Sequence, residues 1–217
     1  MNIRTIAKAT GWSLVAMAVI AGFSLGYAYE TVYSAIQTET IQNAAEHFQL
    51  FQFVLFGLLL TIILDFFVSF TLYKFFKNDN RVISSTSAIL RVVYTLILVI
   101  ATFSLINSLN IWVTDLTTVT ANFERFQFVW TSGLIIFGFH LLLIGFLMKI
   151  HTKIPPILWI ITIIAGLSYI TISLLKVAAP LLEQLTKSLE MIFMLPMAAG
   201  ELGLAIWLIV KGGKSVK

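Results

Sequence analysis

Cysteine is absent from this sequence of 217 residues, which excludes disulfides, thiolate metal sites and a cysteine nucleophile. Charge is scarce as well, because Asp, Glu, Lys and Arg make up 11% of the residues against about 25% in an ordinary soluble domain. The net charge of +4 comes from basic residues spread over loops and a tail without interleaved aromatics, a pattern that does not indicate a nucleic-acid partner. Water is therefore not the main solvent of this chain, and we predict the lipid bilayer as its partner.

Apolar residues are abundant instead and make up 59% of the chain. A helix needs about 20 apolar residues to cross a hydrocarbon core of about 30 Å. Six runs are long enough, at residues 11–29, 49–73, 84–107, 126–148, 155–175 and 188–210. Because the loops between them are short, residues 1–217 are predicted to form a single all-α domain, a six-helix transmembrane bundle.

Lysine and arginine indicate which side of the membrane holds the termini. An even number of spans places both termini on one side, and that side carries ten basic residues against three on the other. The ten are Arg4, Lys8, Lys74, Lys77, Arg81, Lys149, Lys153, Lys211, Lys214 and Lys217, and the three are Arg125, Lys176 and Lys187. Since basic loops stay in the cytoplasm, both termini are predicted to be cytoplasmic.

The first span has a second interpretation. Arg4 and Lys8, the apolar run after them and residues 26–28 also fit a cleaved signal peptide, whose removal would leave five spans. The run is long for a signal peptide, and Gly22 and Gly26 have the spacing of a helix-packing face. We therefore predict that the first span is retained.

Three further segments carry local expectations. The longest loop, residues 30–48, is polar and is predicted to form a short helix on the outer surface. Pro155 and Pro156 open the fifth span, since the first turn of a helix tolerates proline. Pro196 lies inside the sixth span, where we expect it to bend the helix and free a backbone carbonyl near Glu201.

Four acidic, basic or histidine residues lie deep inside the predicted spans, each nine or ten residues from a basic residue at the cytoplasmic end of its helix: Asp65, Arg91, His140 and Glu201. At 1.5 Å per residue, all four lie about 13–15 Å inside that basic level. A lone charge at the bilayer centre costs about 2.5–3.5 kcal/mol, so charges at one level should face inwards and pair. We expect the pairs Asp65–Arg91 and His140–Glu201, although spacing alone leaves the pairing open.

Polar side chains near this level recur on single helix faces, three or four residues apart. They are predicted to support the buried centre and comprise Thr61, Ser69, Ser87, Tyr94, Thr95, Thr162 and Tyr169. The small residues of "AAGELG" let another helix or a ligand approach Glu201. The sequence therefore predicts a polar centre shared by four or five helices.

Several stretches of the sequence resemble a known family. "LYKFFKNDNRVISSTSAILRVVYTLIL", "FGFHLLLIGFLMKIHTKIPPILWIITIIAGLSYI" and "MLPMAAGELGLAIWLIVKGG" are similar to segments of a bacterial membrane family known as domain of unknown function 4386, and "TGWSLVAMAVIAGFSLGYA" fits its first span loosely. The four charged residues match familiar features of that family: Asp65, Arg91 in "LR", His140 in "HLLL" and Glu201 in "GEL". The resemblance implies a six-helix protein of the bacterial plasma (inner) membrane and supplies no activity.

The buried centre is compatible with more than one function. We favour binding of a small ligand or ion, or proton-coupled transport, because carboxylates and a histidine inside a bundle are the usual groups of such sites. The alternative is a structural scaffold whose buried ion pairs fix the helix arrangement. The two three-helix halves do not match as an inverted repeat, which argues against a conventional carrier and leaves a carrier or receptor working as a homo-oligomer open.

An intramembrane hydrolase is a further alternative. Asp65, His140 and Glu201 offer two oxygens and one nitrogen to a divalent metal. No H-E-x-x-H or nucleophile motif accompanies them, and Arg91 at the same level would repel a cation. We therefore assign no catalytic residue, require no cofactor and do not expect an enzyme.

Overall fold

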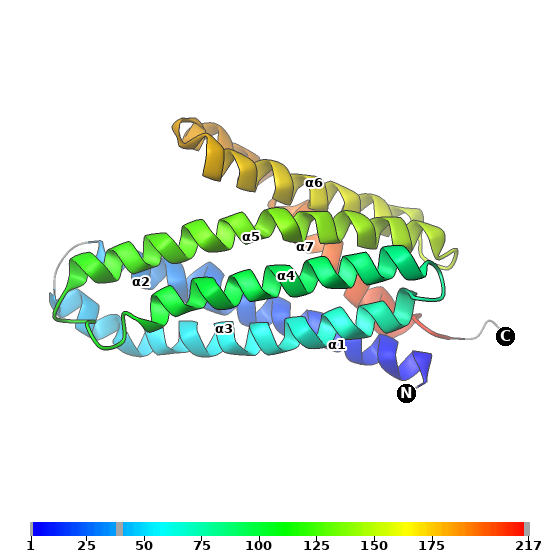
Figure 1. The fold of residues 1–217 in the computed structure, drawn as a ribbon, viewed down its shortest axis with the longest axis horizontal. Helices are drawn as coiled ribbons and strands as arrows, with labels where there is room; N and C mark the ends of the chain where they lie inside the picture. Colours follow the sequence, from blue (N-terminus) through cyan, green and yellow to red (C-terminus); the bar gives the residue numbers. More distant parts are fainter. Residues whose placement is uncertain (1, 38–40, 215–217) are drawn as a thin grey trace.

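The computed structural model describes residues 2–37 and 41–214, and every element in that part of the chain is helical. Its helices are α1 (Ile3–Phe23), which continues through the π-helix η1 (Ser24–Tyr29) into α2 (Glu30–Ile36), then α3 (Ile41–Phe76), α4 (Arg81–Ile106), α5 (Leu116–Ile150), α6 (Pro156–Ala178), the short 3-10 helix η2 (Pro180–Leu182) and α7 (Glu183–Val210) (Figure 1). Six of these helical segments are long and apolar enough to cross a membrane. The predicted all-α, six-span fold is thereby confirmed.

Local sequence signals set several helix ends. The side chain of Asn80 accepts a hydrogen bond from the N–H of Ile83 at 3.0 Å, and this N-cap starts α4. Asp115 caps α5 in the same way, accepting from the N–H of Thr118 at 3.0 Å and from its hydroxyl at 2.6 Å. These two hydrogen bonds hold the pKa of the Asp115 carboxyl below its ordinary value. Pro156 opens α6, as the sequence predicts.

Two helices are much longer than a membrane is thick. With 36 and 35 residues, α3 and α5 are about 54 and 52 Å long, against about 30 Å of hydrocarbon. The described part of residues 30–48 consists of α2 and the start of α3, so it lengthens the first two spans. The prediction of a separate surface helix in this segment is therefore wrong.

The helices form a ring in chain order. Each long helix packs on the next, and α7 packs on α1 to close the ring. The two termini lie at the same end of the bundle, called here the terminal end, and the opposite end is the far end (Figure 1). At the terminal end the guanidinium of Arg4 donates to the carbonyls of Leu208, Ile209 and Gly212 at 3.1, 2.6 and 2.7 Å. These bonds satisfy the last carbonyls of α7 and tie it to α1.

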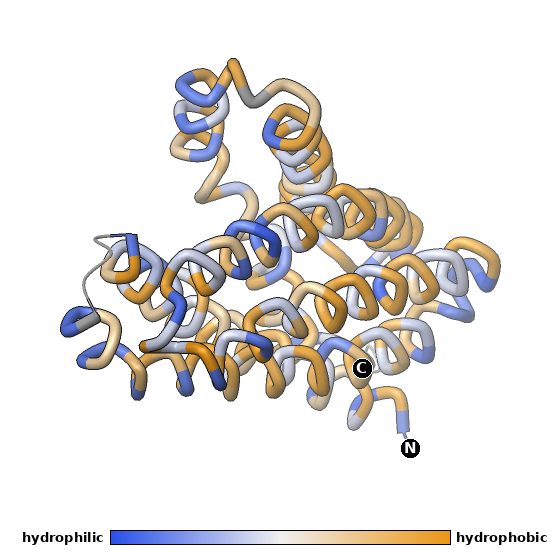
Figure 2. Tube along the Cα trace, turned by 60° about the vertical axis from the view of Figure 1, so that its left-hand side comes forward, coloured by the Kyte–Doolittle hydropathy of each residue, from blue (hydrophilic) through white to orange (hydrophobic). Residues whose placement is uncertain are grey.

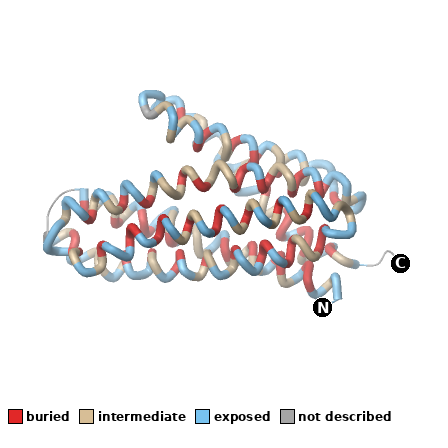
Figure 3. Tube along the Cα trace, viewed as in Figure 1, coloured by how far each residue is buried: buried red, intermediate tan, exposed pale blue. Residues whose placement is uncertain are grey.

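The ring opens toward the far end. There η1 and α2 pack on α3, α2 also reaches α5, and the hydroxyl of Tyr29 donates to the carbonyl of Phe123 at 3.0 Å. The hairpin of α6 and α7 leans away from these helices (Figures 1 and 2). Among residues 183–199 of α7 only Thr186 is buried, and the outer end of the hairpin is mostly pale blue in Figure 3.

Small residues set the closest helix contacts. A Cβ on Gly138 would lie 2.7 Å from the carbonyl oxygen of Gly166, so α5 and α6 cross with their backbones nearly touching. A Cβ on Gly22 or Gly26 would instead meet nothing within 4 Å. The expectation that Gly22 and Gly26 form a helix-packing face is therefore wrong within the chain.

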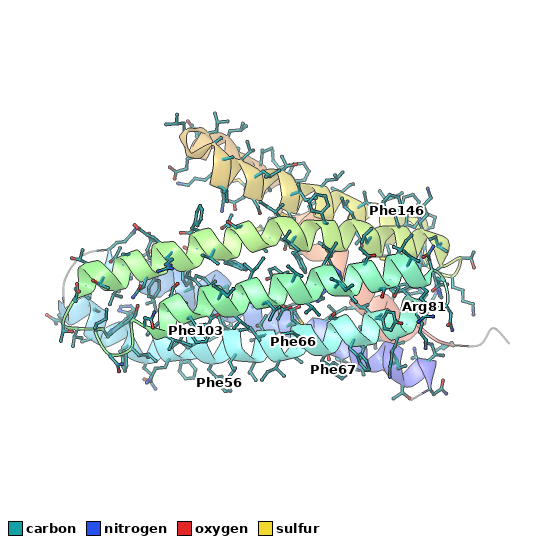
Figure 4. The ribbon with its side chains drawn as sticks, in the orientation of Figure 1. Phe56, Phe66, Phe67, Arg81, Phe103 and Phe146 are labelled. Atoms are coloured by element: carbon teal, nitrogen blue, oxygen red, sulfur yellow. The ribbon has the colours of Figure 1, made fainter. Side chains whose placement is uncertain are left out.

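Apolar side chains cover the outside of the bundle as well as its core. Figure 4 labels five exposed phenylalanines on α3, α4 and α5, and they are Phe56, Phe66, Phe67, Phe103 and Phe146. Inside, one apolar cluster lies toward the far end around Phe51 and Phe123, and a second lies toward the terminal end around Phe76 and Leu208. An apolar surface of this kind faces lipid in a membrane protein, and the polar centre described next lies between the two clusters.

Candidate functional site

Arg91 on α4 is the centre of the buried polar group. Its side chain is 1% exposed. Its Nε donates to Oδ1 of Asp65 on α3 at 2.8 Å, and its Nη2 lies 2.7 Å from the same oxygen. Its Nη1 donates to Oε1 of Glu201 on α7 at 3.0 Å. One guanidinium therefore serves two carboxylates from two different helices.

His140 on α5 completes the centre as a neutral group. Its Nε2 lies 3.1 Å from Nη1 of Arg91, and its Nδ1 lies 2.9 Å from the carbonyl oxygen of Ser87. A guanidinium only donates and a carbonyl only accepts, so Nε2 holds the lone pair and Nδ1 holds the proton. The partners of His140 thus assign one tautomer and leave no proton on Nε2.

The structure brings together all four charged residues that the sequence singled out, with a different pairing. Asp65 and Arg91 contact each other directly, as expected. His140 and Glu201 instead share Nη1 of Arg91, and no hydrogen bond joins these two side chains in the described part of the chain. A direct proton exchange between His140 and Glu201 would require Arg91 to move away first.

Most of the predicted supporting residues that form hydrogen bonds donate them to backbone carbonyls. The hydroxyl of Ser87 lies 2.9 Å from Nδ1 of His140, and Thr95 donates to the carbonyl of Arg91 at 2.8 Å. Ser69 donates to the carbonyl of Ala88, and Thr162 donates to those of Leu158 and Gly200. Thr61, Tyr94 and Tyr169 lie farther from the charges: Thr61 is buried, the hydroxyl of Tyr94 accepts a hydrogen bond from Trp130, and Tyr169 packs edge-on against Phe137.

Sequence reasoning missed Phe137. Its ring centroid lies 5.4 Å from the guanidinium carbon of Arg91 and 5.7 Å from the ring of His140. Phe137 is three residues before His140, on the same face of α5, so helical spacing was the available signal. An apolar side chain in an apolar helix does not stand out, although a ring at this distance from a guanidinium stabilises the cation.

Exposure separates Glu201 from the other three members. The side chains of Asp65, Arg91 and His140 are each about 1% exposed, whereas that of Glu201 is 29% exposed. With both carboxylates ionised and the imidazole neutral, two negative charges face one guanidinium. The centre then carries one excess negative charge, and only Glu201 is open to the surroundings.

The arrangement does not form a metal site. In residues 2–37 and 41–214, no three His, Asp or Glu side chains are grouped so that they could hold a metal ion. Asp65, His140 and Glu201, the candidate ligands, all contact Arg91. A cationic guanidinium thus already occupies the space that these three side chains face.

Pro196 does not act where the sequence suggested. Helix α7 runs through it without interruption. The carbonyl that loses its partner is four residues earlier, at Ile192, which is nine residues or about 13 Å along the helix from Glu201. The expectation of a freed carbonyl near the acid is therefore wrong.

The sequence of the chain matches a known protein family. Residues 9–212 match the family described as domain of unknown function (DUF4386). The chain belongs to the DUF4386 family. This DUF4386 protein is also 30% identical over 158 residues to an uncharacterized protein of Archaeoglobus fulgidus, an alignment that covers 73% of this chain and 83% of the relative. No solved structure matches the chain. The resemblance to DUF4386 is confirmed, and the similarity extends to an archaeon, so it does not by itself indicate a bacterial membrane.

Proposed function

We propose that the Asp65–Arg91–His140–Glu201 centre binds one proton, or one small cation in its place, at Glu201. The observation that carries the proposal is the excess carboxylate: two acids face one guanidinium, while the hydrogen bonds of His140 favour a neutral ring. An uncompensated charge is costly at this depth of a bilayer, so a positive charge is needed. Glu201 is the partly exposed member and is therefore the place for exchange.

Proton binding at this position would be coupled to the position of α7. Ionised Glu201 holds Nη1 of Arg91 through a charge-assisted hydrogen bond, which is about twice as strong as a neutral one. A proton on Glu201 weakens this link, while Arg91 keeps Asp65 as its counter-ion. Protonation thus favours arrangements in which α7 moves away from α4, as proton-coupled transport requires.

Infrared spectroscopy of the purified protein in lipid nanodiscs tests the proposal. As the pH is lowered, the carbonyl absorption of protonated carboxyl groups should include one component that Glu201→Gln removes. Glu30→Gln, which removes an exposed acid on α2, should leave that component unchanged. A titration that is the same in Glu201→Gln and in the unmodified protein would refute proton binding at Glu201.

The scaffold alternative rests on the same contacts. From α4, the Arg91 side chain reaches α3, α5 and α7, so it joins four helices. If this were the whole role, Glu201→Gln would lower the melting temperature and would remove no component of the carboxyl titration. A component that Glu201→Gln removes while the melting temperature stays unchanged would decide for proton binding.

A further inference from the structure

A second site lies at the far end, between α5 and the α6–α7 hairpin. It is a pocket of about 340 Å³, called here the hairpin pocket. The lining residues used below are Glu124 and Phe128 of α5, Lys176 of α6, and Glu183, Lys187 and Glu190 of α7. None of them belongs to the buried centre.

The pocket lies at the level where lipid head groups begin. Glu190 is eleven residues before Glu201, and Glu201 is ten residues before Lys211 at the terminal end of the same helix. These 21 residues span about 31 Å, which matches the hydrocarbon thickness of a bilayer. A ligand in this pocket can therefore come from the leaflet at the far end.

Charges of both signs line the hairpin pocket, with one carboxylate in excess. Lys176 forms an ion pair with Glu190, and Lys187 forms one with Glu183 at 2.6 Å. In the part of the chain that the structure describes, Glu124 forms no ion pair. Both lysines are thus paired already, but an ammonium group has three N–H donors and can bind a phosphate beside its glutamate, while Glu124 is left to bind a cation. This pattern complements a zwitterion.

An apolar track leads away from the pocket along α7. Met191, Ile192, Met194 and Leu195 are 78%, 65%, 62% and 74% exposed. Around the helix these four positions lie within about 160° of one another, so they form one exposed apolar face of α7. Met194 continues the side of the helix that carries Lys187 and Glu190, so an acyl chain on this face would have its head group at the hairpin pocket.

We propose that the hairpin pocket binds a membrane phospholipid whose head group carries a primary ammonium. The lysines face its phosphate, Glu124 accepts hydrogen bonds from its ammonium, and one acyl chain follows α7. Phosphatidylglycerol carries the same phosphate but has no ammonium to compensate the charge of Glu124. A trimethylammonium head group has no N–H to donate. The site is separate from the proposed proton site at Glu201.

Native mass spectrometry in mild detergent tests the lipid proposal. The protein is titrated with phosphatidylethanolamine, phosphatidylcholine and phosphatidylglycerol of identical acyl chains. One phosphatidylethanolamine should bind per chain about tenfold more tightly than the other two. Glu124→Gln should remove that preference, and Glu46→Gln, an exposed acid on α3, should keep it. Equal binding of the three lipids, or a preference that survives Glu124→Gln, would overturn the proposal.

A second pair of variants tests the acyl track without touching a charge. Met194→Trp fills the exposed segment of α7 and should weaken phosphatidylethanolamine binding, whereas Ile100→Trp, on the exposed surface of α4, should not. If both variants bind phosphatidylethanolamine equally well, the acyl chain does not lie along this segment of α7. Glu124→Gln should leave the infrared titration at Glu201 unchanged, so this proposal and the proton proposal fail separately.

Discussion

Arg91 is the residue on which the buried centre depends. A buried cation in a bilayer interior is stable only with its counter-ions, and Arg91 has two carboxylates and a neutral imidazole within hydrogen-bond distance. Removing one partner of a buried ion pair is more harmful than removing both, because the remaining charge has no compensation. Comparing the stability of a variant that lacks Arg91 with one that lacks both Arg91 and Asp65 therefore tests whether these charges are paired inside the bundle.

Arg91→Ala should lower the free energy of unfolding by about 3–5 kcal/mol, because Asp65 is left buried without its cation. The double variant Arg91→Ala with Asp65→Ala should recover part of that loss. Arg81→Ala is the matched control, since Arg81 is exposed at the start of α4, at the terminal end in Figure 4. Thermal unfolding in mild detergent measures all three. A double variant less stable than Arg91→Ala alone would contradict the buried pair.

Among the helices, the crossing of α5 and α6 is the contact most sensitive to one methyl group. A Cβ on Gly166 would lie 2.8 Å from the carbonyl oxygen of Gly138, a backbone atom that cannot turn aside. Gly166→Ala should therefore lower stability by about 1–3 kcal/mol. Gly22→Ala adds the same methyl group where nothing lies within 4 Å and should not lower it. Equal melting temperatures for the two variants would refute the close crossing.

The start of α5 should depend on pH through Asp115. Its carboxylate accepts two hydrogen bonds from Thr118, which lower the pKa of Asp115 in the folded protein. A lowered folded-state pKa means that the cap contributes stability above the ordinary pKa of Asp and loses it as the pH falls through the folded value. The protection of the amides in the first turn of α5, measured relative to their intrinsic hydrogen-exchange rates, should fall in acid. Asp115→Asn should lack this acid-dependent step.

The sequence was enough to predict which segments form helices, but not where the longest helices end. Apolar runs predict the six spans because a bilayer demands about 20 apolar residues. The far ends of α3 and α5 continue beyond that length through polar residues, which hydropathy counts as loop. The spacing of Gly22 and Gly26 suggested packing, but a small residue shows only that close contact is permitted. Which glycine meets a neighbour depends on how the helices are arranged.

For the whole molecule, the common level of the buried centre and the Asp65–Arg91 pair were predictable, whereas the partners of His140 and Glu201 were not. Counting from basic residues placed Asp65, Arg91, His140 and Glu201 at one level, since helix rise is constant. The pairing follows from the ring of helices, which lets Arg91 reach three neighbours. The lean of the α6–α7 hairpin has no signal in hydropathy, because the same apolar side chains suit a lipid contact and a protein contact.

The basic residues also predict how the bundle is oriented in the membrane, with both termini in the cytoplasm. Because the chain has no cysteine, a single introduced cysteine reports its own side of the membrane. Lys77→Cys lies in the loop between α3 and α4 at the terminal end, and Thr117→Cys lies at the far-end start of α5, both at exposed positions. In spheroplasts of a bacterial host, a membrane-impermeant maleimide should label Thr117→Cys at once and Lys77→Cys only after permeabilisation. The reverse labelling pattern would mean that both termini lie outside the cytoplasm and that the hairpin pocket lies in the cytoplasmic leaflet. Something other than the basic loops would then have to determine how the protein inserts.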